Sequence, residues 1–157
     1  MAISQATTQW VTEMNQLKRH EIFSRLQAAN PQPTTELVFA DAFQLLIAVL
    51  LSAQTTDVAV NKVTAVLFAA APTPQAMLEL GEESVRDTIK TIGLYRTKAA
   101  HVMGTCTAIL NQFGGEIPQT RAELESLPGV GRKTANVVLN TAFRQPTMAV
   151  DTHIFRV

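Results

Sequence analysis

Apolar residues recur every three to four positions along most of the chain, and no segment alternates apolar and polar residues as a strand does. This spacing is typical of amphipathic helices. It predicts a first helix that carries the apolar residues from 10 to 26, a fifth marked by residues 85, 89 and 92, and others that begin near residues 41, 56, 73, 95, 120, 132 and 152. The fifth is expected to end at Gly93, the sixth at Gly114 and the eighth at about Asn140. The sequence therefore predicts an all-α fold.

Local signals mark where several of these helices start. Asp41 and Thr73-Pro74 are residue types favoured at the cap and the first position of a helix. Thr120 and Glu123 have the spacing of a capping box. The second helix is apolar on all sides from 45 to 51, so we expect it at the centre of the fold.

Length and composition place the chain among single-domain proteins. It has 157 residues, of which 46% are hydrophobic, enough to bury a core. The N-terminus lacks the basic stretch and apolar run of a signal peptide, and the longest apolar run, 43–53, is too short to span a bilayer. These features favour a soluble, cytoplasmic protein without a membrane partner.

The chain contains one cysteine, Cys106, which excludes a disulfide framework or a cysteine-rich metal site built within one chain. This residue shares helical spacing with apolar residues from 99 to 113, so we interpret it as a buried core thiol. We therefore predict no metal site in this chain.

Charge is distributed unevenly, although the net charge is zero. From Lys90 onward there are eight basic and four acidic residues, a net charge of +4, and the first 89 residues carry −4. Net neutrality argues weakly against nucleic-acid binding. The dipolar layout argues the other way, because it suits a protein whose C-terminal half faces DNA phosphates.

The segment 127–135, LPGVGRKTA, carries the strongest functional signal. A glycine-rich turn directly before a helix presents backbone N–H groups at the positive end of the helix dipole, where a phosphate binds. Lys133 lies in the first turn of that helix, so part of its amine is expected to be uncharged near pH 7 and nucleophilic. From residue types alone, an ordinary helix stop followed by a solvated lysine remains an alternative.

Several blocks of sequence together resemble one family. LPGVGRKTANVVLN at 127–140 and MAVDTHIFRV at 148–157 resemble the helix-hairpin-helix DNA glycosylases, and within them the bacterial endonuclease III group. LLIAVLLSAQTTDVAVNK at 45–62 and IKTIGLYRTKA at 89–99 extend the resemblance. It implies a base-excision-repair enzyme that removes oxidised pyrimidines from duplex DNA and then nicks the strand at the abasic site by β-elimination.

The resemblance also implies roles for individual residues. Lys133 falls on the family's Schiff-base nucleophile and Asp151 on its catalytic carboxylate. Gln54 and Leu94 fall on residues that enter the duplex beside the extruded nucleotide. The remaining residues expected to bind DNA lie in and just after the hairpin: Leu127, Pro128, Gly129, Val130, Gly131, Arg132 and Thr134.

The residue types agree with this chemistry. The sugar must leave the base stack before its anomeric carbon can be reached. Gln54 can hydrogen-bond an orphaned base, and Leu94 is a suitable apolar wedge. An ionised Asp151 would stabilise positive charge on the sugar and could accept a proton from the Lys133 ammonium.

Each of these residues also has a structural explanation. Gln54 could be a polar residue at a helix end, Leu94 could lie in the core or a loop, and Asp151 could be only a helix cap. His153 is more often a structural hydrogen-bonding residue than a catalyst. The number and order of the matching blocks favour the enzyme. A related glycosylase for adenine opposite oxidised guanine shares the hairpin but lacks the lysine, so Lys133 argues against it.

One departure from the family concerns its [4Fe–4S] cluster. The family holds this cluster in a four-cysteine loop, and Cys106 does not match any of those positions. We therefore expect no cofactor from this chain alone, with the four cluster cysteines encoded beyond Val157. The chain is interpreted as truncated before that loop.

Truncation has two expected consequences. A ninth helix that stops at 157 is too short to be stable alone, which would leave Asp151 on a frayed segment. The first helix would expose Trp10, Val11 and Met14, which favours self-association through that helix. The alternative function is therefore a catalytically impaired helix-hairpin-helix module that binds DNA.

The resemblance divides the chain into three expected parts. Residues 1–40 hold the N-terminal helix, which in the family packs on the cluster domain. Residues 41–145 form a six-helix barrel with the helix-hairpin-helix motif at 121–140, and 146–157 begin the second domain with the catalytic aspartate. The expected location is the bacterial cytoplasm, at the nucleoid.

Overall fold

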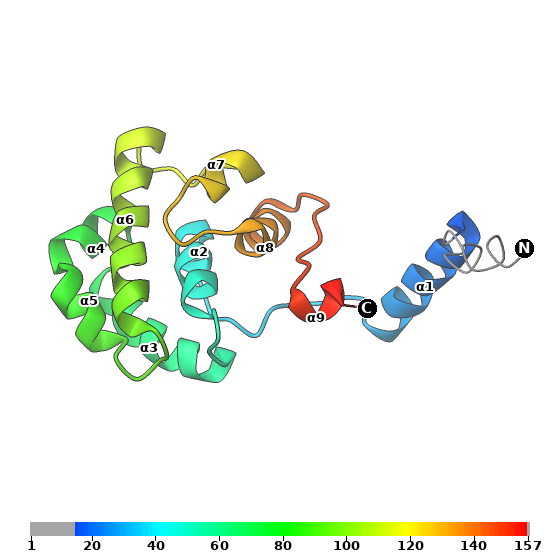
Figure 1. Ribbon diagram of the computed structural model, residues 1–157, viewed down its shortest axis with the longest axis horizontal. Helices are drawn as coiled ribbons and strands as arrows, with labels where there is room; N and C mark the ends of the chain where they lie inside the picture. Colours follow the sequence, from blue (N-terminus) through cyan, green and yellow to red (C-terminus); the bar gives the residue numbers. More distant parts are fainter. Residues whose placement is uncertain (1–14, 157) are drawn as a thin grey trace, which may run out of the picture. The chain divides into compact units, whose positions relative to one another are not determined.

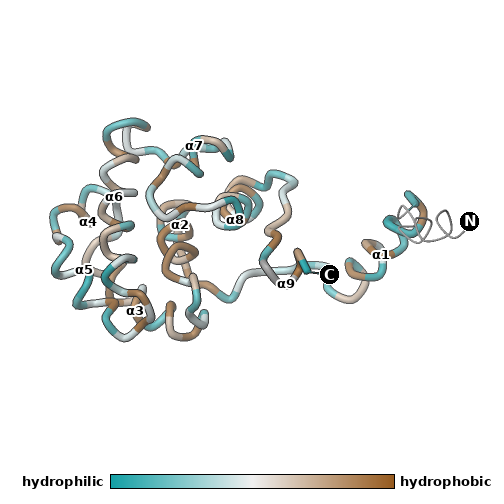
Figure 2. The backbone as a smooth tube through the Cα atoms, in the orientation of Figure 1, coloured by the Kyte–Doolittle hydropathy of each residue, from teal (hydrophilic) through white to brown (hydrophobic). Residues whose placement is uncertain are grey.

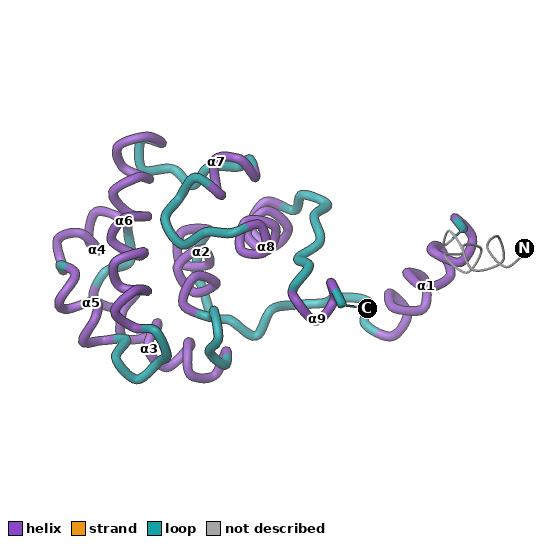
Figure 3. The backbone as a smooth tube through the Cα atoms, viewed as in Figure 1, coloured by secondary structure: helices purple, strands orange, loops and turns teal. Residues whose placement is uncertain are grey.

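The computed structural model describes residues 15–156, apart from the side chains of Thr152 and His153, and it consists of helices joined by turns and loops (Figure 3). No strand occurs among these residues, so the predicted all-α fold is confirmed. The helices, in chain order, are α1 (Gln16–Ala29), α2 (Ala42–Leu51), α3 (Asp57–Ala70), α4 (Pro74–Leu80), α5 (Glu82–Thr88), α6 (Tyr95–Phe113), α7 (Arg121–Glu125), α8 (Arg132–Phe143) and α9 (Thr152–Phe155).

The chain divides into two compact units, residues 1–35 and 36–157. The described part of the first unit is essentially α1, none of whose residues is buried. The exposed face expected at Trp10, Val11 and Met14 lies outside the described residues. The second unit holds the remaining described helices, α2 to α9, and both predicted catalytic residues.

The second unit is built around α2. Every residue of this helix from 45 to 51 is buried, which confirms the predicted central helix. Figure 1 shows α2 between α6 and α8, and Figure 2 shows its strongly apolar character. Helices α4 and α5 pack against α6, and α7 packs against α8. The core therefore fixes the relative positions of α6, which packs against the segment before α8, and α8, whose first turn carries Lys133.

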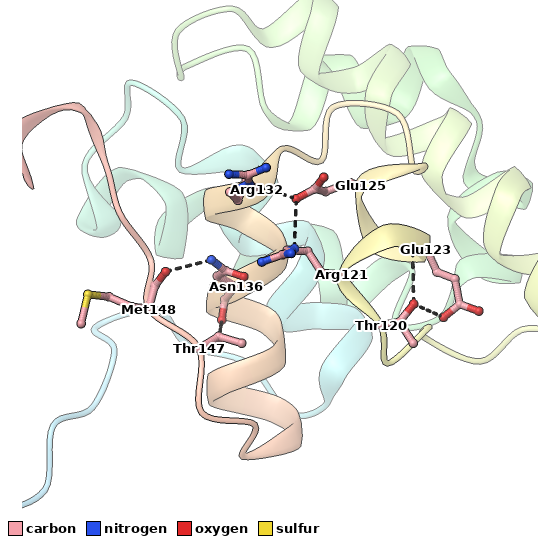
Figure 4. Close-up of polar contacts among 8 residues, drawn as sticks. All are labelled: Thr120, Arg121, Glu123, Glu125, Arg132, Asn136, Thr147 and Met148. Carbon is pink, nitrogen blue, oxygen red and sulfur yellow. Dashed lines mark hydrogen bonds and ion pairs between the residues drawn. The ribbon is translucent and has the colours of Figure 1, made fainter. Parts of the chain in front are cut away.

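The predicted helix start signals at Asp41, Thr73 and Thr120 are confirmed. Each of these side chains accepts a hydrogen bond from the backbone N–H three residues later. The Thr120 hydroxyl also donates to the Glu123 carboxylate at 2.6 Å (Figure 4). This pair forms a variant of the capping box, because the carboxylate bonds the hydroxyl instead of the backbone N–H.

Two helix ends differ from the expected positions. Helix α5 ends at Thr88 instead of Gly93, because the intervening segment folds into turns. Helix α8 continues past Asn140 to Phe143 and stops where Arg144 adopts a left-handed backbone conformation with φ 57°. Periodicity alone could not locate either end, because both depend on the conformation of the segment that follows.

Cys106 is buried in α6, as predicted. Burial raises the pKa of its thiol to about 12. A thiol that stays protonated at neutral pH is neither a good metal ligand nor a nucleophile. Cys106 therefore acts as a small core residue.

Among the described residues, no single helix has both the length and the apolarity to span a membrane. One pair of helices bent by 90°, α3 with α4, meets that test jointly, by length and composition only.

Candidate active site

The glycine-rich hairpin is a tight turn between α7 and α8. The Val130 N–H donates to the Leu127 carbonyl oxygen at 3.1 Å, and Gly129 has φ 76°. Proline followed by a glycine of positive φ is typical of a type II turn. The side chains of Leu127 and Val130 are buried, so only their backbone groups can meet a ligand. Pro128, Gly129 and Gly131 are exposed.

Helix α6 packs closely against this hairpin. A Cβ placed on Gly129 would lie 2.5 Å from Nδ1 and 2.9 Å from Cβ of His101. A Cβ on Gly104 would lie 3.0 Å from Cγ of Pro128, and the Thr105 hydroxyl donates to the Pro128 carbonyl oxygen at 2.9 Å. The conformation of the hairpin therefore depends on small or hydrogen-bonding residues of α6.

Gly129→Ala is expected to lower the free energy of unfolding by more than Gly114→Ala does. Both glycines have positive φ, 76° and 62°, a region in which a Cβ costs roughly 1–2 kcal/mol. Only Gly129 also faces the ring of His101, whereas nothing lies within 4 Å of a Cβ on Gly114. Urea denaturation of the two variants measures the difference.

A second substitution separates backbone strain from collision with the ring. His101→Ala added to Gly129→Ala should recover part of the extra loss, because it removes the ring atoms and leaves only the Cβ contact. Equal losses for Gly129→Ala and Gly114→Ala would show that α6 does not restrict the hairpin.

Helix α8 begins directly after the hairpin, with Gly131 at its N-cap and no side chain of the described residues capping it. The first-turn N–H groups of such a helix start are available to an anion. Arg132, Lys133 and Thr134 all lie in this first turn. The turn and open helix start that the sequence predicted are thus present, and phosphate binding there stays a prediction.

Lys133 and Asp151 meet beside the start of α8. The Lys133 Nζ lies 3.6 Å from the Asp151 Oδ2, and the two side chains are 57% and 32% exposed. This distance is longer than that of a tight charge-assisted hydrogen bond, so the ion pair holds the amine loosely. The structure therefore brings the two predicted catalytic residues together and leaves the amine accessible.

Asp151 is held in place from both sides. Its Oδ1 accepts a hydrogen bond from the Ile154 N–H at 2.9 Å, which caps α9. Upstream, the Asn136 side-chain amide donates to the Met148 carbonyl oxygen at 2.8 Å, and the Thr147 hydroxyl donates to the Asn136 carbonyl oxygen at 2.6 Å (Figure 4). Asp151 therefore follows a segment that is hydrogen-bonded to α8 and caps α9, and the fraying expected from the short ninth helix stays a prediction.

Arg132 lies beside an acidic residue. Its Nε is 3.7 Å from Glu125 Oε1, and the Nε of Arg121 is 3.9 Å from the same oxygen (Figure 4). Exposed ion pairs of this length contribute little to stability. Both guanidinium groups therefore remain able to exchange this carboxylate for a phosphate.

Gln54 and Leu94 lie on two neighbouring loops, one after α2 and the other before α6. Both are exposed, Leu94 by 57%, and both adopt left-handed backbone conformations, with φ 54° and 59°. Such φ values are uncommon for residues other than glycine. A Cβ on Gly93 would lie 3.9 Å from the Gln54 carbonyl oxygen, so the two loops lie close together. The alternative of a core position for Leu94 is wrong.

Sequence reasoning missed the roles of Asn136 and Lys98. Asn136 ties the segment before Asp151 to α8, and a polar residue within an apolar helix face was the available signal. Lys98 was counted among the bases that face DNA, but it is buried. The side chain of His153 lies outside the described residues, so its predicted structural role stays open to test.

The chain matches known proteins over most of its length. The profile of the HhH-GPD superfamily of base excision DNA repair proteins matches residues 47–157. Endonuclease III of Escherichia coli (strain K12) is 66% identical over 144 residues, which cover 92% of this chain and 68% of that protein. The chain belongs to the endonuclease III family. This is a family of DNA glycosylase/AP lyases that act in base excision repair.

A second endonuclease III protein matches the chain to a similar extent. The protein from Haemophilus influenzae (strain ATCC 51907 / DSM 11121 / KW20 / Rd) is 58% identical over 92% of this chain and 68% of its own length. The chain thus spans about two thirds of the length of the curated relatives it matches.

Two solved structures of endonuclease III bound to DNA have the same fold. A non-covalent endonuclease III–DNA complex superposes with a TM-score of 0.83 at 44% identity, over 90% of this chain and 66% of that chain. A trapped endonuclease III–DNA covalent intermediate, an estranged-adenine complex, gives a TM-score of 0.84 at 44% identity, over 90% and 67%. These neighbours agree with the expectation that the chain binds DNA.

Endonuclease III proteins carry an iron–sulfur cluster, and the residues of this chain do not fit one. A [4Fe–4S] cluster takes four cysteine thiolates, whereas this chain has one cysteine, and its thiol is buried and protonated. Within the described part of the chain, no group of three or more His, Cys, Asp and Glu residues could hold a metal ion.

Proposed function

We propose that this chain excises oxidised pyrimidines from duplex DNA and cleaves the strand at the resulting abasic site, with Lys133 as the nucleophile. The observation that carries this proposal is the Lys133–Asp151 pair, 3.6 Å apart, beside a helix start with no side-chain cap. A site of this kind combines a nucleophilic amine, a carboxylate and donors for a phosphate.

Base removal and covalent attachment form the first stage. The glycosidic bond breaks with its electron pair going to the base, and a bond forms between Lys133 Nζ and the anomeric carbon. Asp151 supports this step in two ways, since its charge stabilises the electron-poor sugar and its Oδ2 can take a proton from the amine. An abasic site enters the same path through its aldehyde, which condenses with the amine and releases water.

Strand cleavage forms the second stage. Once the sugar ring has opened, the lysine is joined to the sugar as an imine, which acidifies the C2′–H bond. Transfer of that proton to a water molecule sends the electron pair into a new C2′–C3′ double bond, and the C3′–O bond breaks with its electrons leaving on the 3′ phosphate. Water then hydrolyses the imine and returns the free amine of Lys133.

The remaining site residues hold the opened duplex. The backbone N–H groups of the hairpin and of the first turn of α8 would bind a phosphate near the damaged nucleotide. Gln54 and Leu94, both exposed on adjoining loops, would occupy the space left by the extruded nucleotide. The covalent endonuclease III–DNA intermediate among the structural neighbours supports, by analogy, the proposed covalent attachment to DNA.

Borohydride trapping on an abasic-site duplex tests the proposal. The expected result is a covalent protein–DNA adduct, and peptide mapping by mass spectrometry should place it on Lys133. Reduction traps only an imine, so the experiment reports the proposed intermediate directly.

Two outcomes would contradict the proposal. An adduct on a different lysine would remove Lys133 as the nucleophile. DNA binding that depends normally on salt, without an adduct or a nick, would favour the alternative of a catalytically impaired DNA-binding module.

Two finer expectations rest on the family alone. The preference for oxidised pyrimidines over other lesions stays a prediction, as does the presence of four cluster cysteines beyond Val157. Self-association through the N-terminal helix also stays a prediction. It is supported by the exposed apolar side chains of α1, which are Leu17, Ile22, Phe23 and Leu26.

A further inference from the structure

One buried cation lies beneath the two loops that carry Gln54 and Leu94. Lys98, in the first turn of α6, is only 4% exposed, in contrast to the other lysines of the described residues. Burial lowers the pKa of its ammonium group. A lysine is rarely buried without a partner, because removing the charge from water is costly.

The side chain of Lys98 joins the start of α6, which follows Leu94, to the loop of Gln54. Its Nζ donates to the Thr55 hydroxyl oxygen at 2.8 Å, one residue after Gln54, and its backbone N–H makes the first helical bond of α6, to the Leu94 carbonyl oxygen at 2.9 Å. The Thr55 hydroxyl in turn donates to the Ala53 carbonyl oxygen at 3.3 Å. The hydrogen bonds therefore run from α6 to the residues on both sides of Gln54.

We propose that Lys98 is a positioning residue that locks the loop of Gln54 against the loop of Leu94, so that both side chains enter the duplex as one rigid unit. This inference rests on the proposed function, since it concerns how those two residues open DNA. It also explains why a charged residue is tolerated at a buried position.

Rigidity matters here because opening a duplex costs energy. Extruding a nucleotide costs a few kcal/mol of stacking and pairing. A backbone that is already fixed in a left-handed conformation loses no further backbone freedom when its side chain inserts. Without the Lys98–Thr55 bond, the loop after α2 would have to be ordered at the moment of binding. The expected defect therefore lies in opening the duplex and not in the chemical steps.

Hydrogen exchange of the free protein tests the lock without DNA. In Lys98→Met, the Thr55 and Ile92 amides, which bond Ser52 and Ile89 carbonyl oxygens within the two loops, should exchange about tenfold faster. The amide of Ala71, which is hydrogen-bonded at the end of α3, should keep its wild-type exchange rate. In the control variant Lys62→Met, which changes an exposed lysine, all three amides should exchange at the wild-type rate.

A double-mutant cycle then asks whether the two side chains act as a pair. Thr55→Val removes the hydroxyl with little change of shape, and the double variant Lys98→Met/Thr55→Val should show no greater loop exchange than either single variant. The single variant Thr55→Ser, which keeps the hydroxyl, should show the loop exchange rates of wild type.

The DNA measurement compares a paired abasic site with the same site in an unpaired bulge. For Lys98→Met, the concentration needed for half-maximal single-turnover nicking should rise about tenfold on the paired site, with the saturating rate unchanged. On the bulge, which is already open, both values should match wild type. Lys62→Met should behave as wild type on both DNAs.

Two results would overturn the inference. Unchanged loop exchange in Lys98→Met would show that no lock exists, and equal losses on paired and bulged DNA would show that Lys98 only supports the fold. Wild type that nicks neither DNA would refute the proposed function, and the exchange data would still decide whether the lock exists.

Discussion

Lys133→Gln is expected to abolish borohydride trapping and to slow cleavage at an abasic site by at least about a thousandfold, because the amide cannot form an imine. Glutamine keeps much of the length and polarity of the side chain. Lys133 is more than half exposed, so the variant should unfold at a urea concentration close to that of wild type. Single-turnover nicking assays and trapping gels measure both effects.

The matched control is Lys62→Gln, which removes an exposed lysine from the surface of α3. It should retain trapping and cleavage. Lys133→Gln should still bind an abasic-site duplex, with a modest loss from the missing charge, because the hairpin is untouched. Trapping at the wild-type level in Lys133→Gln would refute the assignment of the nucleophile.

Asp151→Asn is expected to slow base excision by about a hundredfold or more, through loss of both the charge and the proton acceptor. Asparagine is as good an N-cap as aspartate, so the bond from the Ile154 N–H to the side-chain oxygen is expected to survive. The variant thus removes charge while keeping the local fold. Excision of an oxidised pyrimidine at saturating enzyme measures the effect.

Asp41→Asn is the control for this substitution. Asp41 caps α2 in the same way, by accepting a hydrogen bond from the Gln44 N–H, and lies outside the catalytic pair. It should excise the base at the wild-type rate. If Asp151→Asn also excised the base at that rate, Asp151 would be only a cap, which is the structural explanation that the sequence allowed.

The sequence predicted the fold well where the signals are local. The caps at Asp41, Thr73 and Thr120 depend on a side chain and a backbone N–H three residues away, and all three were found. The central α2 followed from its uniformly apolar composition. The ends of α5 and α8 were missed, because they depend on turns and on the unusual φ of Arg144.

The candidate site was predictable only in part. Lys133 and Asp151 were identified through the family resemblance, and the structure brings them within 3.6 Å. What holds them there could not be predicted. The contacts of Asn136 with the segment before Asp151, and of Lys98 with Thr55, join residues that are distant in sequence and follow no periodic pattern.

The open start of α8 also has a thermodynamic consequence. Helices α2, α3, α4 and α7 begin with a capping side chain, and α8 begins with Gly131 and no such cap. A capping side chain adds about 1 kcal/mol to stability. A serine or aspartate at position 131 is expected to make the free protein more stable, but its own oxygen would occupy the proposed phosphate position. Helices α5 and α6 also begin without a side-chain cap, but only the start of α8 lies beside Lys133 and Asp151. If a phosphate binds there as proposed, the substrate would supply the hydrogen bonds that a capping side chain supplies elsewhere.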